Sequence, residues 1–152
     1  LTDWLSSCRI RKVMQHDNNG CGIACVSMVT GEQYPAVRQA FVSNGLGVRK
    51  NRPLATNFSE LQRGLALHGV QSQRRRWGTW DDIDGLGIVA VDSAYGSSTC
   101  WHWIVAERHR TYGIVIHDPD FHLPSFSDQT PPGVVAHPFS EYQPRRSWIR
   151  IL

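Results

Sequence analysis

Apolar positions in the first third of the chain follow helical spacing. An apolar run begins after Gly20 and stops at Gly31, which predicts a short buried helix over residues 21–30. A second helix is expected to begin at Pro35, because proline suits the first turn of a helix, and to end near residue 44. The first third of the chain is therefore expected to be largely helical.

A third helix is predicted by the spacing of Asn57 and Glu60. A capping residue followed three positions later by glutamate is a capping-box pattern, which marks the start of a helix. The helix is expected to close at Gly69. Its apolar face is expected to consist of Leu61, Leu65 and Leu67.

Beyond residue 69 the pattern changes to segments rich in β-branched and aromatic residues, which is typical of strands. The predicted strands are residues 70–77, 86–91, 101–107, 113–117 and 147–152. Residues 119–144 carry most of the prolines and predict a long structured loop. Helices first and strands afterwards favour the α+β class over alternating βαβ units. We expect N-terminal helices packed on an antiparallel β-sheet.

The size and charge of the chain narrow its class. Its 152 residues fit one domain over residues 1–152, and a formal charge of +3 gives no reason to expect nucleic-acid binding. No apolar run is long enough to span a bilayer, and no signal peptide opens the sequence. The sequence begins at Leu1 rather than Met, which leaves open an export signal further upstream.

The four cysteines form neither a disulfide framework nor a Cys-x-x-Cys redox motif. Cys21 and Cys25 lie one helical turn apart, a poor geometry for a disulfide, so a reduced, cytosolic setting is the simpler expectation. Cys25 lies within the apolar run and is expected in the core, while Cys8 carries no functional signal. Cys100 precedes His102 by two positions on a strand, so the two share a face, and a core role is expected for the cysteine.

A polar, turn-forming segment leads directly into the first helix. Residues 15–20 read Gln-His-Asp-Asn-Asn-Gly, and they place Cys21 at the helix N-terminus. There the unpaired N–H groups and the positive end of the helix dipole stabilise a thiolate, and the same N–H groups can bind an oxyanion. The side-chain amide of Gln15 could donate a second such bond. We therefore expect Cys21 to be a nucleophile with an oxyanion hole beside it.

A thiol nucleophile needs a base, and the base needs an orienting group. The predicted hairpin over residues 101–118 has a polar turn centred on Arg110. Pairing that is symmetric about this residue places His102 directly opposite Asp118, close enough for the carboxylate to hold the imidazole in one tautomer. The expected triad therefore consists of Cys21, this histidine and this aspartate.

Other residues of the hairpin are expected to have structural roles. His117 occupies the opposite face from the predicted base, and His109 lies in a turn that is expected to be exposed. Trp101 and Trp103 also alternate onto the face opposite the base, where a core role is favoured over a place in the wall of a substrate cleft. The apolar residues on the face of the base are expected to pack on the first helix: Ile104, Ala106, Ile114 and Ile116.

Two further patterns suggest binding chemistry but favour simpler roles. Residues 74–76 are arginines followed by Trp77, with Trp80 nearby, which resembles a cationic strip for nucleic acid. In a chain of modest charge this strip is expected to be a solvated strand edge, or a contact for an acidic substrate or partner. A metal site near the triad would have to use Cys21, Cys100, His102 and Asp118. Their spacing matches no common zinc pattern, so no metal or other cofactor is expected.

Taken in order, these motifs resemble the papain-like peptidase domain that is fused to bacteriocin-exporting ABC transporters and cuts leader peptides after a double glycine. The resemblance covers about residues 10–128. The matching pieces are Gln15 six residues before Cys21, the run Cys21-Gly22-Ile23-Ala24-Cys25, the helix over residues 61–70, the His102-Trp-Ile-Val segment and Ile116-His117-Asp118-Pro119. The resemblance implies a papain-like fold. It assigns the nucleophile to Cys21 and the base to His102, and it likewise assigns the orienting acid to Asp118 and the oxyanion donor to Gln15.

The residues and the resemblance together predict a cysteine peptidase that hydrolyses a peptide or protein through a thioester, without a cofactor. These 152 residues hold no membrane span and no Walker motif. The expectation is therefore a standalone processing peptidase, or an effector secreted into a target cell and covered by an inhibitory or immunity partner. An acyl transferase or deamidase could use the same triad, as phytochelatin-synthase-like and transglutaminase-like proteins do. A peptide-binding module without turnover is the other alternative, although no triad residue is missing.

Overall fold

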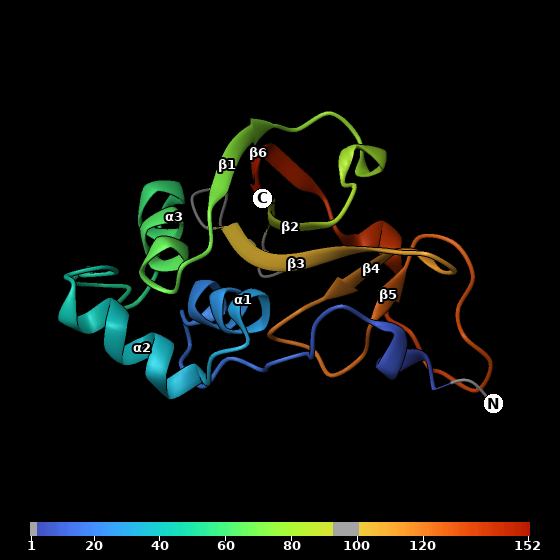
Figure 1. The fold of residues 1–152 in the computed structure, drawn as a ribbon, viewed down its shortest axis with the longest axis horizontal. Helices are drawn as coiled ribbons and strands as arrows, with labels where there is room; N and C mark the ends of the chain where they lie inside the picture. The colour runs from blue at the N-terminus through green and yellow to red at the C-terminus, as the bar shows by residue number, and fades with distance from the viewer. Residues whose placement is uncertain (1–2, 93–100) are drawn as a thin grey trace.

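The structure, a computed structural model, describes residues 3–92 and 101–152, which form three α-helices and a six-stranded antiparallel sheet (Figure 1). The helices are α1 (Cys21–Thr30), α2 (Tyr34–Ser43) and α3 (Phe58–Leu67). The strands are β1 (Ser72–Arg76), β2 (Leu86–Asp92), β3 (Trp101–His109), β4 (Gly113–His117), β5 (Ser125–Phe126) and β6 (Pro144–Ile151). They lie in the order β1-β6-β2-β3-β4-β5, so the α+β arrangement expected from the sequence is confirmed.

The residues that predicted the helix ends act as caps. α1 begins at Cys21 and is closed by Gly31, whose left-handed backbone (φ 79°) suits glycine. The side chain of Asn57 accepts a hydrogen bond from the Glu60 N–H, and the Glu60 carboxylate accepts one from the Asn57 N–H. The expectation for Leu67 was wrong. Its side chain is 45% exposed, because it lies on the far side of α3 from the two buried leucines.

Strand boundaries differ by a few residues from those predicted. β1 is shorter than expected, whereas β6 begins at Pro144, earlier than expected, and lies between β1 and β2. The predicted long loop contains β5 and a single-turn 3-10 helix at Phe139–Glu141. Within the described residues, no helix has both the length and the apolar character needed to cross a bilayer.

Both faces of the sheet are covered. The three helices lie along β3 on one face (Figure 1). There Trp103 and Val105 of β3 lie in a core with buried residues of all three helices. On the other face, a second core includes Ile83, Tyr142 and Trp148. The four residues expected to pack on the first helix lie in this second core: Ile104, Ala106, Ile114 and Ile116. That expectation was wrong because α1 occupies the face of Trp103, and alternate strand residues point to opposite faces.

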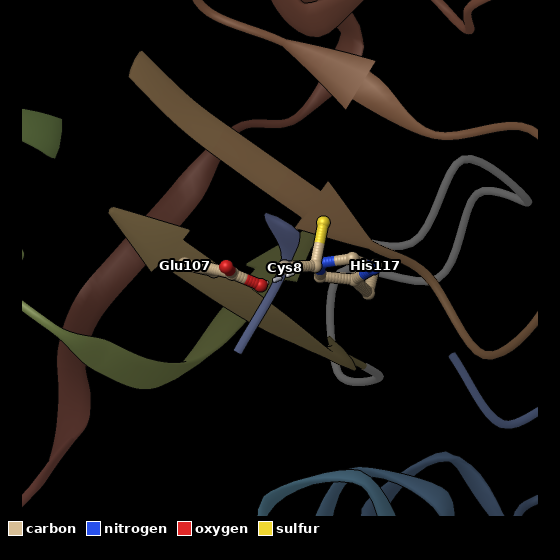
Figure 2. Close-up of side chains that lie close together, drawn as sticks. All are labelled: Cys8, Glu107 and His117. Carbon is tan, nitrogen blue, oxygen red and sulfur yellow. Dashed lines mark hydrogen bonds and ion pairs between the residues drawn. The ribbon is translucent and has the colours of Figure 1, made fainter. Parts of the chain in front are cut away.

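The segment before α1 is fixed to the sheet by buried polar groups (Figure 2). Cys8 of this segment lies beside Glu107 of β3 and His117 of β4. The Glu107 carboxylate accepts the Arg9 N–H at 2.7 Å and contacts His117 Nε2 at 3.1 Å. Glu107 and His117 are 1% and 2% exposed, so water does not compete for this contact. A paired carboxylate thus holds the N-terminal segment in place.

His109 also helps to hold the N-terminal segment in place, although the sequence predicted that it lies in an exposed turn. It is the last residue of β3 and only 4% exposed. Its Nδ1 accepts the N–H groups of Thr111 and Tyr112, so Nε2 carries the proton and donates to Ser7 Oγ at 2.7 Å. The N-terminal segment covers this end of the hairpin, and the prediction was wrong because the local pattern carries no trace of such a distant contact.

The N-terminal segment is fixed again where it reaches the turn before α1. The Gln15 N–H donates to the Pro119 carbonyl at 2.9 Å. Pro119 follows Asp118 directly in the chain. The segment is therefore held to the sheet near Arg9 and to the chain beyond β4 at Gln15, and these two attachments set where the turn before α1 begins.

Replacing Glu107 with alanine is expected to lower the free energy of unfolding by about 3–5 kcal/mol, because His117 and the Arg9 N–H would lose their buried partner. Urea denaturation followed by tryptophan fluorescence would measure the change. Glu32→Ala, at an exposed glutamate, is the matched control and is expected to change stability by less than about 0.5 kcal/mol. Equal effects of the two substitutions would contradict the anchoring role.

Candidate active site

The turn before α1 is braced by α2, and this fixes the start of α1. Asp17 accepts hydrogen bonds from the Tyr34 hydroxyl at 2.7 Å and from Arg38 Nε at 3.1 Å. Within the turn, the Gly20 N–H donates to the Asp17 carbonyl at 3.0 Å, and Gly20 is the N-cap of α1. Cys21 is thus the first residue of the helix, where backbone N–H groups have no acceptor within the helix itself.

His102 and Asp118 form a close pair, with Nε2 of the ring 2.6 Å from Oδ1 of the carboxylate. Because Nε2 is engaged, Nδ1 is the ring nitrogen left for Cys21. Burial alone would lower the pKa of His102, but hydrogen bonds with Asp118 and Cys21 outweigh it and raise the pKa from 6.5 to about 10. At neutral pH a protonated imidazole therefore lies beside the cysteine sulfur.

The pairing of β3 with β4 differs from the predicted register by two positions. The turn is centred on Thr111, since His109 pairs with Gly113, so the predicted direct opposition of His102 and Asp118 was wrong. Moving the centre of a hairpin by one residue changes each cross-strand partner by two positions. Such a change keeps every side chain on its original face. His102 and Asp118 therefore still share a face and meet diagonally.

Asp118 is only 1% exposed and is held by more than the histidine. Its Oδ1 also accepts the Asp120 N–H at 2.8 Å, and its Oδ2 accepts the Tyr142 hydroxyl at 2.8 Å. Burial alone would raise the pKa of Asp118, but the contacts with His102 and with these donors lower it. Nothing in the sequence pattern pointed to Tyr142, which lies in the proline-rich loop outside every recognised motif.

The two pKa shifts define the pH range in which the pair stabilises the fold. The pKa of His102 is raised on folding, so its contribution is complete below about pH 6.5 and is lost as the pH rises through about 10. The pKa of Asp118 lies below its ordinary value of 3.8, so its contribution is complete above that value and is lost as the pH falls. The pair is therefore expected to be intact from mildly acidic to mildly alkaline pH.

Gln15 lines the same cavity as Cys21, but its amide is engaged with the turn. Its Nε2 donates to the carbonyls of Asp17 and Asn18, both at 3.0 Å. Its Oε1 is buried and has no hydrogen-bond partner among the described residues. The oxyanion role expected for Gln15 stays a prediction. It requires Nε2 to give up its hydrogen bond to one of the two turn carbonyls and to donate to the oxyanion of the substrate instead.

Cys21 and His102 line a cavity of about 290 Å³. Residues from the turn before α1, from the segment around residues 49–57 and from the start of β3 form its walls. Trp103 lies deep in the wall and is 2% exposed, so the core role expected for it is confirmed. Trp101 is half-buried instead and forms part of the cavity wall, so its predicted core role holds only in part.

The cavity wall beside Cys21 depends on a glycine. A Cβ atom at Gly22 would lie 2.5 Å from Thr56 Oγ1, so a larger residue would push the helix away from this wall. Thr56 packs closely against Gly22 and lies at the edge of the cavity. Its carbonyl accepts a hydrogen bond from Trp103 Nε1 at 3.3 Å. Its Oγ1 is buried and has no partner within residues 3–92 and 101–152.

The other described cysteines are unsuited to nucleophilic chemistry. Burial and the neighbouring carboxylates Glu107 and Asp3 raise the pKa of Cys8 to about 12. Burial raises the pKa of Cys25 well above its ordinary value, and complete burial confirms the core role expected for this residue. Cys100 lies outside the described residues, so the expectation for it stays a prediction.

One cluster has a donor set that a metal ion could use. The sulfur of Cys8, a carboxylate oxygen of Glu107 and a ring nitrogen of His117 all lie within 4.8 Å of one another (Figure 2). Both Glu107 oxygens already accept hydrogen bonds, and the Cys8 thiol donates to the Trp4 carbonyl at 3.6 Å. A metal ion would have to displace these contacts, so we assign the cluster to anchoring the N-terminal segment.

Two solved structures resemble this fold over nearly the whole chain. One is a double glycine motif protease from an AMS/PCAT transporter in complex with the leader peptide, with a TM-score of 0.59 and 16% identity, covering 95% of this chain and 92% of that one. The other is the peptidase domain of Streptococcus ComA, a bifunctional ABC transporter involved in a quorum-sensing pathway, with a TM-score of 0.62 and 17% identity, covering 93% and 96%.

No protein-family model matches the sequence, and no curated protein matches it either. The likeness therefore lies in the arrangement of helices and strands. Three helices on a six-stranded antiparallel sheet match the architecture of both peptidase domains. The chain has the papain-like fold of the double-glycine peptidase domains.

Proposed function

We propose that the chain is a cysteine peptidase that hydrolyses a peptide bond through Cys21, His102 and Asp118. The observation that supports this most directly is the 2.6 Å contact between His102 and a buried carboxylate, in a cavity that Cys21 also lines. A helix N-terminus, a histidine and an orienting carboxylate are the parts that a thiol nucleophile needs. The fold likeness to two peptidase domains supports the same class of reaction.

In the proposed mechanism, the proton of Cys21 already lies on His102 Nδ1 in the resting ion pair, and the thiolate attacks the carbonyl carbon of the substrate. The tetrahedral intermediate collapses as the imidazolium passes its proton to the departing amine, which leaves a thioester on the cysteine. Water then gives a proton to His102 and attacks the thioester, which releases a carboxylic acid and restores the thiolate beside the protonated imidazole. Asp118 stays ionised and keeps the ring oriented throughout.

The oxyanion that forms in both addition steps needs hydrogen-bond donors. We assign this role to the backbone N–H of Cys21, at the start of α1, and to Nε2 of Gln15 after it exchanges one turn carbonyl for the oxyanion.

Iodoacetamide is expected to alkylate Cys21 rapidly well below pH 8, because the protonated His102 beside it favours the thiolate. Mass spectrometry of the labelled peptides would measure the rate at each pH, with Cys100 replaced by serine. His102→Ala is expected to slow labelling at neutral pH by about tenfold or more. Cys8 and Cys25 serve as internal controls, since the raised pKa of each keeps it a thiol. A labelling rate that depends on pH as for an ordinary thiol, and that is the same in wild type and His102→Ala, would contradict the proposed ion pair.

Peptides containing a double glycine are the first substrates to test, because one solved structure with this fold holds a leader peptide. Wild-type protein is expected to cut such a peptide into a free acid and a free amine, and Cys21→Ala is expected to abolish the cut. Mass spectrometry separates the alternatives: a new amide in the presence of an added amine indicates acyl transfer, and ammonia release without chain cleavage indicates deamidation. Export into a target cell and an inhibitory or immunity partner stay predictions.

Tyr142→Phe is expected to raise the pKa of Asp118, because the hydroxyl that donates to Oδ2 is lost. The acid limb of the pH–rate profile should move to higher pH, kcat should fall with little change in KM, and stability should fall by about 1–3 kcal/mol. Tyr112→Phe is the matched control, since that tyrosine contacts His109 and Phe126 through its ring. An unmoved acid limb in Tyr142→Phe would show that the residue does not position the acid.

A further inference from the structure

A second hollow, of about 1150 Å³, lies beside the catalytic cavity and carries five arginines. We call it the arginine groove, and it is lined by the edge strand β1, the start of β6, and Phe58 at the start of α3. Its arginines are Arg74, Arg75, Arg76, Arg145 and Arg146. Asp92 is the acidic residue in its lining. This excess of positive charge attracts an acidic ligand.

Two of these guanidinium groups are seated on aromatic rings. Arg74 Cζ lies 4.1 Å from the centre of the Phe58 ring, and Arg145 Cζ lies 5.3 Å from the centre of the Trp101 ring. Arg145 also pairs with Asp92 at 2.8 Å. A guanidinium held against a ring keeps N–H groups available at its edge, so part of the groove is already arranged for carboxylates before a ligand binds.

The arginine groove continues the catalytic cavity. Trp101 lines both hollows, and Asn57 in the wall of the catalytic cavity is followed directly by Phe58 in the groove. A polypeptide bound with its reacting bond at Cys21 would therefore enter the groove within a few residues. Arg52 lines the catalytic cavity, so positive charge extends from the groove towards the nucleophile.

We propose that the arginine groove binds an acidic segment of the polypeptide substrate, a few residues away from the bond that Cys21 attacks. This inference rests on the proposed peptidase function. Aspartate or glutamate carboxylates of the substrate would accept paired hydrogen bonds from the guanidinium groups. The groove thereby selects substrates by charge at a distance from the reacting bond.

A purely protective role and a nucleic-acid ligand both fit the groove less well. Arginines on an edge strand can discourage sheets from associating, but Arg145 and Arg146 lie on β6, which is paired on both sides. The modest formal charge of +3 gives no broad surface for a phosphate backbone.

Binding of a fluorescein-labelled octaglutamate peptide to the Cys21→Ala protein, measured by fluorescence anisotropy, tests the inference without any turnover. The peptide is expected to bind, and binding is expected to weaken as salt is raised. An octaglutamine peptide of the same length should bind at least about tenfold more weakly. Because no activity is needed, failure of the peptidase proposal would leave this result interpretable.

Arg74→Gln combined with Arg76→Gln is expected to weaken octaglutamate binding by about tenfold or more. Arg110→Ala, at the exposed turn after β3, is the matched control and should bind as the parent protein does. Circular dichroism, and labelling of Cys21 in the same substitutions made on the wild-type chain, would show that the fold is retained. Equal binding of octaglutamate and octaglutamine, or equal or tighter binding of an oligothymidylate of eight nucleotides, would overturn the inference.

Discussion

A carboxylate without access to water must find its hydrogen-bond partners within the protein, and this requirement shapes the candidate active site. Asp118 meets it with His102 of β3, with the N–H of Asp120 and with the hydroxyl of Tyr142. These donors come from three separate parts of the chain. The carbonyl of the next residue, Pro119, accepts the N–H of Gln15 and so attaches the turn that leads to Cys21, the proposed nucleophile. One buried charge thus brings together all the groups that the proposed reaction uses.

The parts of this arrangement that depend on local chemistry could be predicted from the sequence. The bounds of α1 follow from Gly20 and Gly31, and the start of α3 follows from its capping box, because each cap acts within a few residues. The shared face of His102 and Asp118 could also be predicted, although the register was wrong. Side chains alternate with a period of two, so an error of two positions leaves the faces unchanged.

The rest depends on contacts between distant segments, which no local pattern records. Burial of His109 comes from a segment that precedes it by about 100 residues, and Tyr142 reaches the acid from a loop without a motif. The face of the sheet on which α1 packs could not be predicted either, because both faces of β3 and β4 are apolar. A sheet that is buried on both sides gives no signal in the alternation of its residues.

The place of β6 in the sheet has a consequence for when the proposed active site can form. β6 follows all the other strands in sequence, yet it lies between β1 and β2 in space. During synthesis, Cys21, His102 and Asp118 all emerge from the ribosome before the strand that joins the two parts of the sheet. Tyr142 emerges just ahead of that strand. A growing chain therefore carries every group of the proposed triad before it has the framework to align them, so the proposed activity must wait until the fold is closed.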